Sequence, residues 1–194
     1  MKGRDLSERF VSGEEVWTGR LLHVHRDLVR LPDGHETTRE YIRHPGAVCI
    51  VPLLDDGRVV LVRQFRYPLA REFVELPAGK KHPGEDPLLT AQRELAEETG
   101  YTAADWRRFA VIHNAIGYSD EAIELYLARG LKEGTAALDP GEFLEAFTVP
   151  FAEAVEMVRD GRITDAKTVC ALLWVDRFLD DRPAQRAAQP QSPV

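Results

Sequence analysis

The chain has 194 residues, of which 44% are hydrophobic and 29% charged, an ordinary composition for a globular protein with a substantial core. Its net charge of −7 and scattered Arg and Lys residues argue against a nucleic-acid-binding protein, which usually carries a basic patch. No stretch approaches the roughly 20 apolar residues of a membrane span, and the polar segment 1–10 does not resemble a secretory signal. Cys49 and Cys170 lie in apolar runs, so we expect two buried, reduced thiols in a cytoplasmic protein.

The first part of the chain is predicted to form a β-hairpin arm. Residues 17–31 are rich in β-branched and aliphatic side chains with partial alternation, which is typical of a strand. The turn sequence Pro32-Asp33-Gly34 follows, and residues 37–43 are expected to form the returning strand. Residues 1–16 show no clear pattern, and we expect them to fray.

A second pair of strands is predicted around the turn Asp55-Asp56-Gly57. Residues 47–54 form an apolar run of strand length and residues 58–65 follow the turn, so we expect the two segments to pair as a hairpin. A short strand is expected at 73–76, before Pro77-Ala78-Gly79. Further strands are predicted at residues 107–113, 122–128 and 143–149.

The segment 86–99 carries the clearest helix signal. Asp86 is a favourable N-cap, and Pro87 occupies the first helical position, where its missing N–H is not needed. Gly100 follows the last turn, where a left-handed conformation is usually required. The stripe facing the core is predicted to comprise Leu88, Ala91 and Leu95.

Two more helices are predicted near the C-terminus. The first spans residues 151–159, and the second spans 166–179 with Asp165 as its cap. The apolar stripe of the second helix is predicted to comprise Val169, Leu172, Leu173 and Val175. Strands dominate with a few helices between them, which predicts an α+β fold with helices packed on a mixed sheet, preceded by the β arm.

Three glutamates lie on one arc of the predicted helix 86–99. Glu94 is four residues from Glu98 and three from Glu97, so all three side chains are neighbours, and each like-charge pair costs a few tenths of a kcal/mol. A divalent cation such as Mg²⁺, which prefers carboxylate oxygens and water, would compensate this repulsion. The alternative is a solvated acidic face, on which Arg93 is only a surface partner of Glu97.

The wider spacing decides between these alternatives, because the segment resembles the Nudix box. Accidental agreement at all seven fixed positions is on the order of one in a million. Leu95 fills the aliphatic position of the box, whereas Tyr101 is aromatic where the family usually has Ile, Leu or Val. The seven matching residues are Gly79, Glu85, Arg93, Glu94, Glu97, Glu98 and Gly100.

The resemblance implies a metal-dependent hydrolase with a Nudix fold, an α/β/α sandwich. By this resemblance Glu94 and Glu98 are the main metal ligands, Glu97 is a further ligand or support, and the carbonyl group of Ala78 joins the metal shell. The implied metal is Mg²⁺, with Mn²⁺ as a possible substitute. Such cations neutralise a diphosphate, polarise phosphorus and lower the pKa of the attacking water.

Glu85 and Arg93 are implied to be orienting residues, which hold the loop of the box against its helix. Motifs outside the box, over roughly residues 17–180, resemble the ADP-ribose pyrophosphatase branch, which splits ADP-ribose into AMP and ribose 5-phosphate. They are Arg39-Glu40, His44-Pro45-Gly46-Ala47, Gln64-Phe65-Arg66, Leu76-Pro77-Ala78-Gly79, Gly117, Ser119-Asp120-Glu121 and Asp165-Ala166-Lys167-Thr168.

In that branch the β arm is exchanged across a homodimer and contributes to the nucleotide pocket. By analogy Arg39 and Glu40 contact the base or ribose, and Arg66 contacts a phosphate or the distal sugar. The alternative for each is a surface charge on a strand. The implied organisation is an arm at residues 1–45, a Nudix domain at 46–181 and a disordered tail at 182–194.

Two positions depart from the pattern of that branch. Ile116 precedes Gly117, where the branch usually has proline. The acidic loop that supplies a general base or further metal ligand contains Pro140, and only Glu142 keeps a carboxylate at a key position. Glu142 is therefore the candidate base or ligand, and the alternative is a plain loop residue; Glu145 and Glu121 are the reserves.

Other activities fit the box as well. The same chemistry on GDP-mannose, NADH, dinucleoside polyphosphates or oxidised nucleoside triphosphates is one alternative. A binding module that senses a nucleotide sugar without cutting it is another. The complete set of box carboxylates argues against the sensor, because binding alone does not require them.

Overall fold

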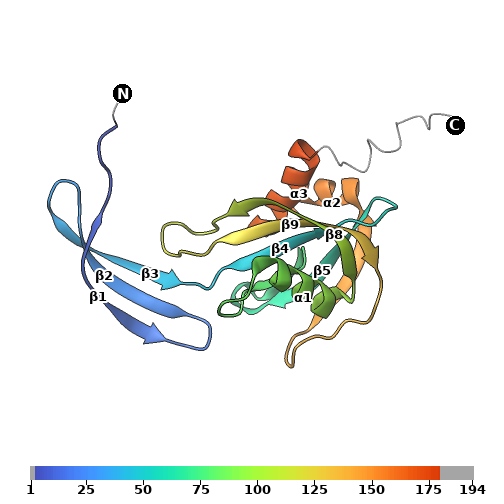
Figure 1. Cartoon of the computed structure of the whole chain (residues 1–194), viewed down its shortest axis with the longest axis horizontal. Helices are drawn as coiled ribbons and strands as arrows, with labels where there is room; N and C mark the ends of the chain where they lie inside the picture. The colour runs from blue at the N-terminus through green and yellow to red at the C-terminus, as the bar shows by residue number, and fades with distance from the viewer. Residues whose placement is uncertain (1–2, 180–194) are drawn as a thin grey trace. The chain divides into compact units, whose positions relative to one another are not determined.

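The computed structural model describes residues 3–179, and these divide into two compact units (Figure 1). One unit, here the arm unit, comprises the chain up to Gly46 together with residues 113–122. The other, the core unit, comprises residues 47–112 and the chain from Ile123. The segment 182–194, predicted to be disordered, lies outside the described residues.

The arm unit is an antiparallel sheet of three strands in the order β1-β2-β3, with β1 at Arg9–Thr18, β2 at His23–Arg30 and β3 at Glu36–Arg43. The predicted hairpin is confirmed, and Gly34 adopts a φ of 91° in its turn. The expectation that residues 1–16 lack structure was wrong, because β1 occupies most of that segment. Irregularities in its register interrupt the two-residue alternation, and every residue of β1 is exposed, so no hydrophobic pattern marks the strand.

The core unit contains a mixed sheet in the order β7-β4-β9-β8. β4 (Ala47–Pro52) pairs parallel to β9 (Ile123–Lys132), whereas β7 (Ala78–Lys80) and β8 (Thr102–Ile112) join their neighbours antiparallel. All six residues of β4 are buried. The prediction of a mixed sheet is therefore confirmed.

A second sheet of the core unit has the order β10-β5-β6 and is antiparallel. It comprises β5 (Arg58–Arg66), β6 (Arg71–Glu75) and β10 (Leu144–Pro150), and a short 3₁₀ helix, η1 (Tyr67–Leu69), joins β5 to β6. The predicted hairpin of residues 47–54 and 58–65 was wrong, because only one bridge, Leu53 to Val59, links these strands. Both edges of β4 are already occupied by β7 and β9, so β5 pairs in the other sheet.

Helices cover both faces of the mixed sheet, and Figure 1 shows α1 on one side and α2 and α3 on the other. Successive side chains of a strand point to opposite faces, so Val48 and Ile50 of β4 pack with α1 (Pro87–Thr99). Cys49 and Val51 lie in the other hydrophobic cluster, which includes residues of α2 (Phe151–Arg159) and α3 (Ala166–Phe178). This α/β/α arrangement confirms the expected fold class.

The predicted helix caps are confirmed. The Asp86 side chain accepts a hydrogen bond of 2.9 Å from the Leu88 amide, and Gly100 ends α1 with a φ of 76°. Asp165 caps α3 by accepting from the Thr168 amide at 3.1 Å.

The orientation of α3 differs from the prediction in two respects. Leu173, predicted to face the core, is 38% exposed, and Cys170, predicted to be buried, is exposed. The buried face of α3 carries Thr168, Ala171, Leu172 and Val175. Among residues 3–179, no helix has the length and apolar character needed to cross a membrane.

The packing of α1 predicts a large difference between two of its leucines. Leu95 is fully buried against β4 and β9, whereas Leu89 on the same helix is 58% exposed. We expect Leu95→Ala to lower the free energy of unfolding by about 2–5 kcal/mol, because the substitution leaves a cavity. Leu89→Ala should change it by less than about 0.5 kcal/mol. Urea denaturation of both variants measures the difference, and equal effects would contradict this packing.

Candidate functional site

A glycine allows α1 to approach β7 closely. A Cβ atom added to Gly79 would lie 1.9 Å from Cδ of Glu94 and 2.0 and 2.3 Å from its two carboxylate oxygens. Real Cβ atoms do not approach other atoms so closely, so any other residue would displace the Glu94 side chain. The absence of a side chain at Gly79 thus creates the space in which the carboxylate lies.

Arg93 joins two carboxylates of α1 to the preceding loop. Its Nε and Nη2 atoms donate to the two oxygens of Glu85, both at 3.1 Å, and Nη1 donates to Glu94 at 2.8 Å and Glu97 at 3.0 Å. The Arg93 hydrogen bonds, helped by one from the His82 amide, lower the pKa of Glu85 to about 2. The pair therefore fixes the loop between β7 and α1, as a two-pronged guanidinium–carboxylate contact does.

Glu98 lies deeper and lacks such a partner. Its side chain is 8% exposed, and its Oε2 atom accepts a hydrogen bond of 3.1 Å from the amide of Ala78. Burial raises the pKa of Glu98 to about 8, and the neighbouring charges of Glu94 and Glu142 add to this rise. Burial also raises the pKa of Glu94. The inner end of the site thus brings together carboxylates whose charged forms are disfavoured by burial and by one another.

The donors at this inner end fit a hard divalent cation. Within residues 3–179, no three His, Cys, Asp or Glu side chains form a complete metal-binding cluster. Mg²⁺ does not require one, because it is commonly held by one or two carboxylates, with water and substrate phosphates completing its shell. The carboxylates of Glu94 and Glu98, beside the backbone of Ala78, offer such a partial set.

Glu142 approaches this group from another segment. It lies in the turn before β10, where its amide donates to the carbonyl oxygen of Asp139 at 2.9 Å, and it is exposed. The structure brings its charge close enough to raise the pKa of both Glu94 and Glu98. The reserves lie elsewhere: Glu145 pairs with Arg63 at 2.5 Å, and Glu121 belongs to the arm unit.

Arg66, one of the predicted substrate-binding residues, has a partner that the sequence did not reveal. Arg66, at the end of β5, donates to both oxygens of Glu75, at 2.6 and 2.7 Å. Lys167 at the start of α3 donates to the same carboxylate at 2.5 Å. Glu75 is 3% exposed. A charged residue inside the apolar run before the box was its only sequence signal, because Lys167 is 92 residues away.

Comparison with known proteins shows the family of the chain. Residues 43–172 match the NUDIX domain, which is more than half of the chain. The chain belongs to the Nudix family.

Individual relatives extend over nearly the whole chain. A methanol dehydrogenase activator of Bacillus methanolicus is 39% identical, covering 89% of this chain and 95% of the relative. An ADP-ribose pyrophosphatase of Bacillus subtilis is 37% identical, covering 89% and 94% respectively. A crystal structure of an ADP compounds hydrolase superposes with a TM-score of 0.82 at 26% identity, covering 91% of this chain and 97% of that one. The protein is therefore a Nudix pyrophosphohydrolase, and enzymes of this family generally depend on divalent metal ions.

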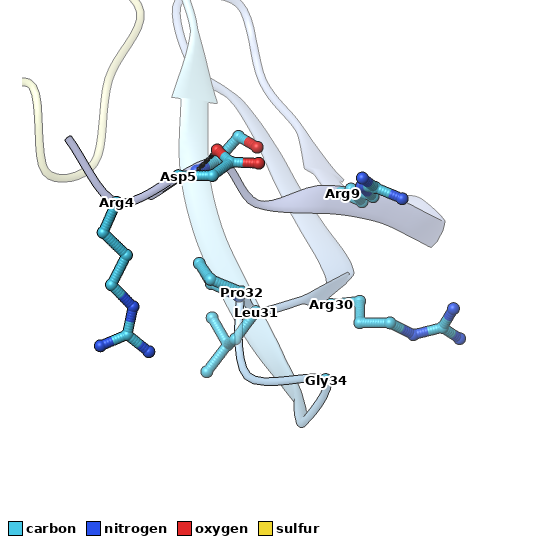
Figure 2. Close-up of a pocket in the computed structure, with 8 residues that line it drawn as sticks. Arg4, Asp5, Arg9, Arg30, Leu31, Pro32 and Gly34 are labelled. Atoms are coloured by element: carbon cyan, nitrogen blue, oxygen red, sulfur yellow. Dashed lines mark hydrogen bonds between the residues drawn. The ribbon is translucent and has the colours of Figure 1, made fainter. Parts of the chain in front are cut away.

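The arm unit of this Nudix enzyme holds the other two predicted substrate residues. Arg39 pairs with Glu8 at 2.6 Å, and Glu40 pairs with Arg26 at 2.8 Å. A pocket of about 430 Å³ in this unit is lined by different residues, including Arg4, and Figure 2 shows that its three arginine side chains do not converge. The full lining is Arg4, Asp5, Ser7, Arg9, Arg30, Leu31, Pro32 and Gly34.

The raised pKa of Glu98 predicts that stability falls with rising pH. The folded protein keeps the proton of Glu98 up to a pKa of about 8, whereas the unfolded chain loses it near 4.5. The stabilisation that this bound proton provides is complete below pH 4.5. It falls progressively as the pH rises from 4.5 and is lost once the pH has passed 8. Glu98→Gln cannot lose this proton, so in EDTA its stability relative to the wild type should increase between pH 5 and pH 8.

Urea denaturation at several pH values measures this difference. Glu153→Gln on the exposed surface of α2 is the control, and it should follow the wild type at every pH. A stability difference between Glu98→Gln and the wild type that does not change with pH would show that Glu98 is ionised throughout.

Proposed function

We propose that this Nudix enzyme hydrolyses the pyrophosphate bond of a nucleoside diphosphate sugar in a Mg²⁺-dependent reaction. ADP-ribose, split into AMP and ribose 5-phosphate, is the proposed substrate. The observation that carries the proposal is the buried carboxylate of Glu98 together with the partly buried carboxylate of Glu94, which lies beside Gly79. The name of the Bacillus subtilis relative, which the chain covers over 94% of its length, supports the choice of substrate.

The residues proposed to hold Mg²⁺ are Glu94 and Glu98, with Glu97 and the carbonyl group of Ala78 completing the protein's share. Mn²⁺ is a possible substitute. When bound, the cation neutralises the diphosphate, polarises phosphorus and lowers the pKa of the attacking water. Gly79 leaves room for Glu94, and the Ala78 amide fixes the orientation of Glu98.

The remaining residues of the proposed catalytic set orient groups or move a proton. Arg93 and Glu85 hold the loop that contains Gly79 against α1, so that the carboxylates keep their positions. Glu142 is exposed beside the carboxylate group, and one of its oxygens can accept a proton from the attacking water. Glu97 and Glu98 would contribute by holding the cation.

Substrate recognition is proposed to involve Arg66 of the core unit and Arg39 and Glu40 of the arm unit. Arg66 would contact a phosphate or the distal sugar, and the two arm residues the base or ribose. We further propose that residues 1–45 are a dimerisation arm, that residues 46–181 are the hydrolase domain, and that the enzyme is cytoplasmic. Apolar side chains on the fully exposed strand β1, including Phe10 and Trp17, support a second copy of the chain as the partner of the arm.

A panel of substrates tests the proposed reaction. With Mg²⁺ present, we expect ADP-ribose to yield AMP and ribose 5-phosphate faster than GDP-mannose, NADH or dinucleoside polyphosphates are cut. Chromatography resolves the products. Glu98→Gln, which removes one ligand charge, should reduce turnover by orders of magnitude, on the scale of about 10²-fold or more.

The controls separate a catalytic effect from unfolding. Circular dichroism should show that Glu98→Gln is folded, and Glu153→Gln should keep the wild-type rate. Normal turnover of Glu98→Gln, or full activity of the wild type in excess EDTA, would remove the proposed metal site.

The proposed dimer is tested through β1. Deletion of residues 1–45 should convert a dimer into a monomer, because the arm carries the proposed contact. The double variant Phe10→Ser/Trp17→Ser removes two exposed aromatic side chains from an intact chain and should weaken the dimer too. Gel filtration with light scattering measures the mass, and Glu14→Gln on the same strand is the control. A dimer that survives the deletion would reject the arm as the interface.

A further inference from the structure

A buried carboxylate in the core unit is shared by two cations. Glu75, at the end of β6, is 3% exposed, yet it accepts hydrogen bonds from both Arg66 and Lys167. Burial raises the pKa of Glu75, but the hydrogen bond of Arg66 and the charge of Lys167 outweigh burial, and the net pKa is lowered. Glu75 is therefore ionised, and such a buried ion costs free energy unless its partners are well placed.

The two cations have different surroundings. Lys167 is largely buried, with 12% of its side chain exposed, and it also donates to Asp165 at 2.9 Å. Asp165 caps α3, and the Thr168 hydroxyl accepts from the amide of Leu76 at 2.9 Å. Lys167 thus belongs to a contact that fastens the end of β6 to α3.

Arg66 instead faces solvent beside the carboxylates. Its side chain is 46% exposed, and its guanidinium is close enough to Glu98 for that charge to contribute to the raised pKa of Arg66, after the larger effect of Glu75. Nε and Nη2 of the guanidinium donate to Glu75, whereas Nη1 donates to no acceptor among residues 3–179. The contact with Glu75 therefore fixes the plane of the guanidinium and leaves donors free on its other edge.

We propose that Glu75 is a positioning residue, which holds the Arg66 guanidinium in the orientation that binds the diphosphate or distal sugar of the substrate. This inference rests on the proposed function, because Arg66 is the group that would touch the substrate. Glu75 itself is covered by Arg66 and Lys167 and acts only through Arg66. Lys167 supplies a second positive charge beside Glu75, so the carboxylate stays ionised while it holds the Arg66 guanidinium.

A purely structural role of Glu75 makes a different prediction. In that case loss of the carboxylate would lower stability, but the folded fraction would bind substrate as before, and any loss of activity would be independent of Arg66. If Glu75 is a positioning residue, loss of Glu75 and loss of the planar Arg66 guanidinium remove the same contribution to catalysis. A double-mutant cycle separates the two roles, because coupled residues are not additive.

The cycle comprises Glu75→Gln, Arg66→Lys and the double variant, assayed for kcat/KM on ADP-ribose at saturating Mg²⁺. Arg66→Lys keeps the positive charge but not the planar guanidinium with its paired donors. We expect each single variant to lose about 10- to 100-fold in kcat/KM, since small misplacements of a binding group have effects of this size. The double variant should be about as active as Arg66→Lys alone. Losses that multiply in the double variant would overturn the proposal.

Glu75→Asp covers the case in which Glu75→Gln does not fold. It keeps the buried charge between the two cations but shortens the side chain by one methylene, so it should remain folded and still lose activity. Thermal denaturation and circular dichroism accompany each assay. Wild-type kcat/KM in folded Glu75→Asp would overturn the proposal.

Glu124→Gln is the matched control, because Glu124 on β9 also lies between an arginine and a lysine, Arg108 at 2.6 Å and Lys81 at 4.0 Å. Its kcat/KM should stay near that of the wild type. If the wild type cuts no nucleoside diphosphate sugar, the proposed function fails, and the cycle is then run on whichever pyrophosphate substrate the enzyme accepts. A wild type that cuts ADP-ribose combined with an additive cycle refutes the role of Glu75 alone.

Discussion

The close approach of α1 to β7 is the constraint on which the site depends. A helix carrying three glutamates would be most stable with all of them in water, yet Gly79 admits Glu94 into the space that a side chain would fill. The same approach buries Glu98 against the amide of Ala78. The packing of Leu95 and Ala91 on β4 and β9 stabilises this arrangement, so hydrophobic contacts on one side of α1 offset the electrostatic cost on the other.

Two carboxylates of the box show how strongly position decides charge. Glu85 and Glu98 have the same ordinary pKa, but the structure lowers one to about 2 and raises the other to about 8. Glu85 is gripped by Arg93, whereas Glu98 is buried with a single backbone donor. Groups whose environments separate their pKa values in this way often have different roles. Here one carboxylate stabilises the loop, and the other is available to a cation.

The sequence predicted the features that depend on short spacings. The caps of α1, its core stripe and the arc of its glutamates all involve neighbours within about one or two turns of a helix, and the box is recognised by its resemblance to a family. It failed where distant partners decide the outcome. β5 pairs in the second sheet because β7 and β9 occupy both edges of β4. The register shifts of β1 interrupt the alternation by which a strand is recognised in a sequence. Glu75 was missed for the same reason, since its burial has meaning only beside Arg66 and Lys167.

The ion pairs between glutamates and arginines indicate which carboxylate is left for a metal ion. Glu75, Glu85 and Glu124 are each paired with an arginine of the protein, so their charges are balanced permanently. No described Arg, Lys or His forms an ion pair with Glu98, although Glu98 is only 8% exposed. A permanent partner there would compete with any cation that arrives with the substrate. The chain thus neutralises its structural carboxylates itself and leaves Glu98 to be neutralised by a proton or by a metal ion, which couples the state of the site to its occupancy.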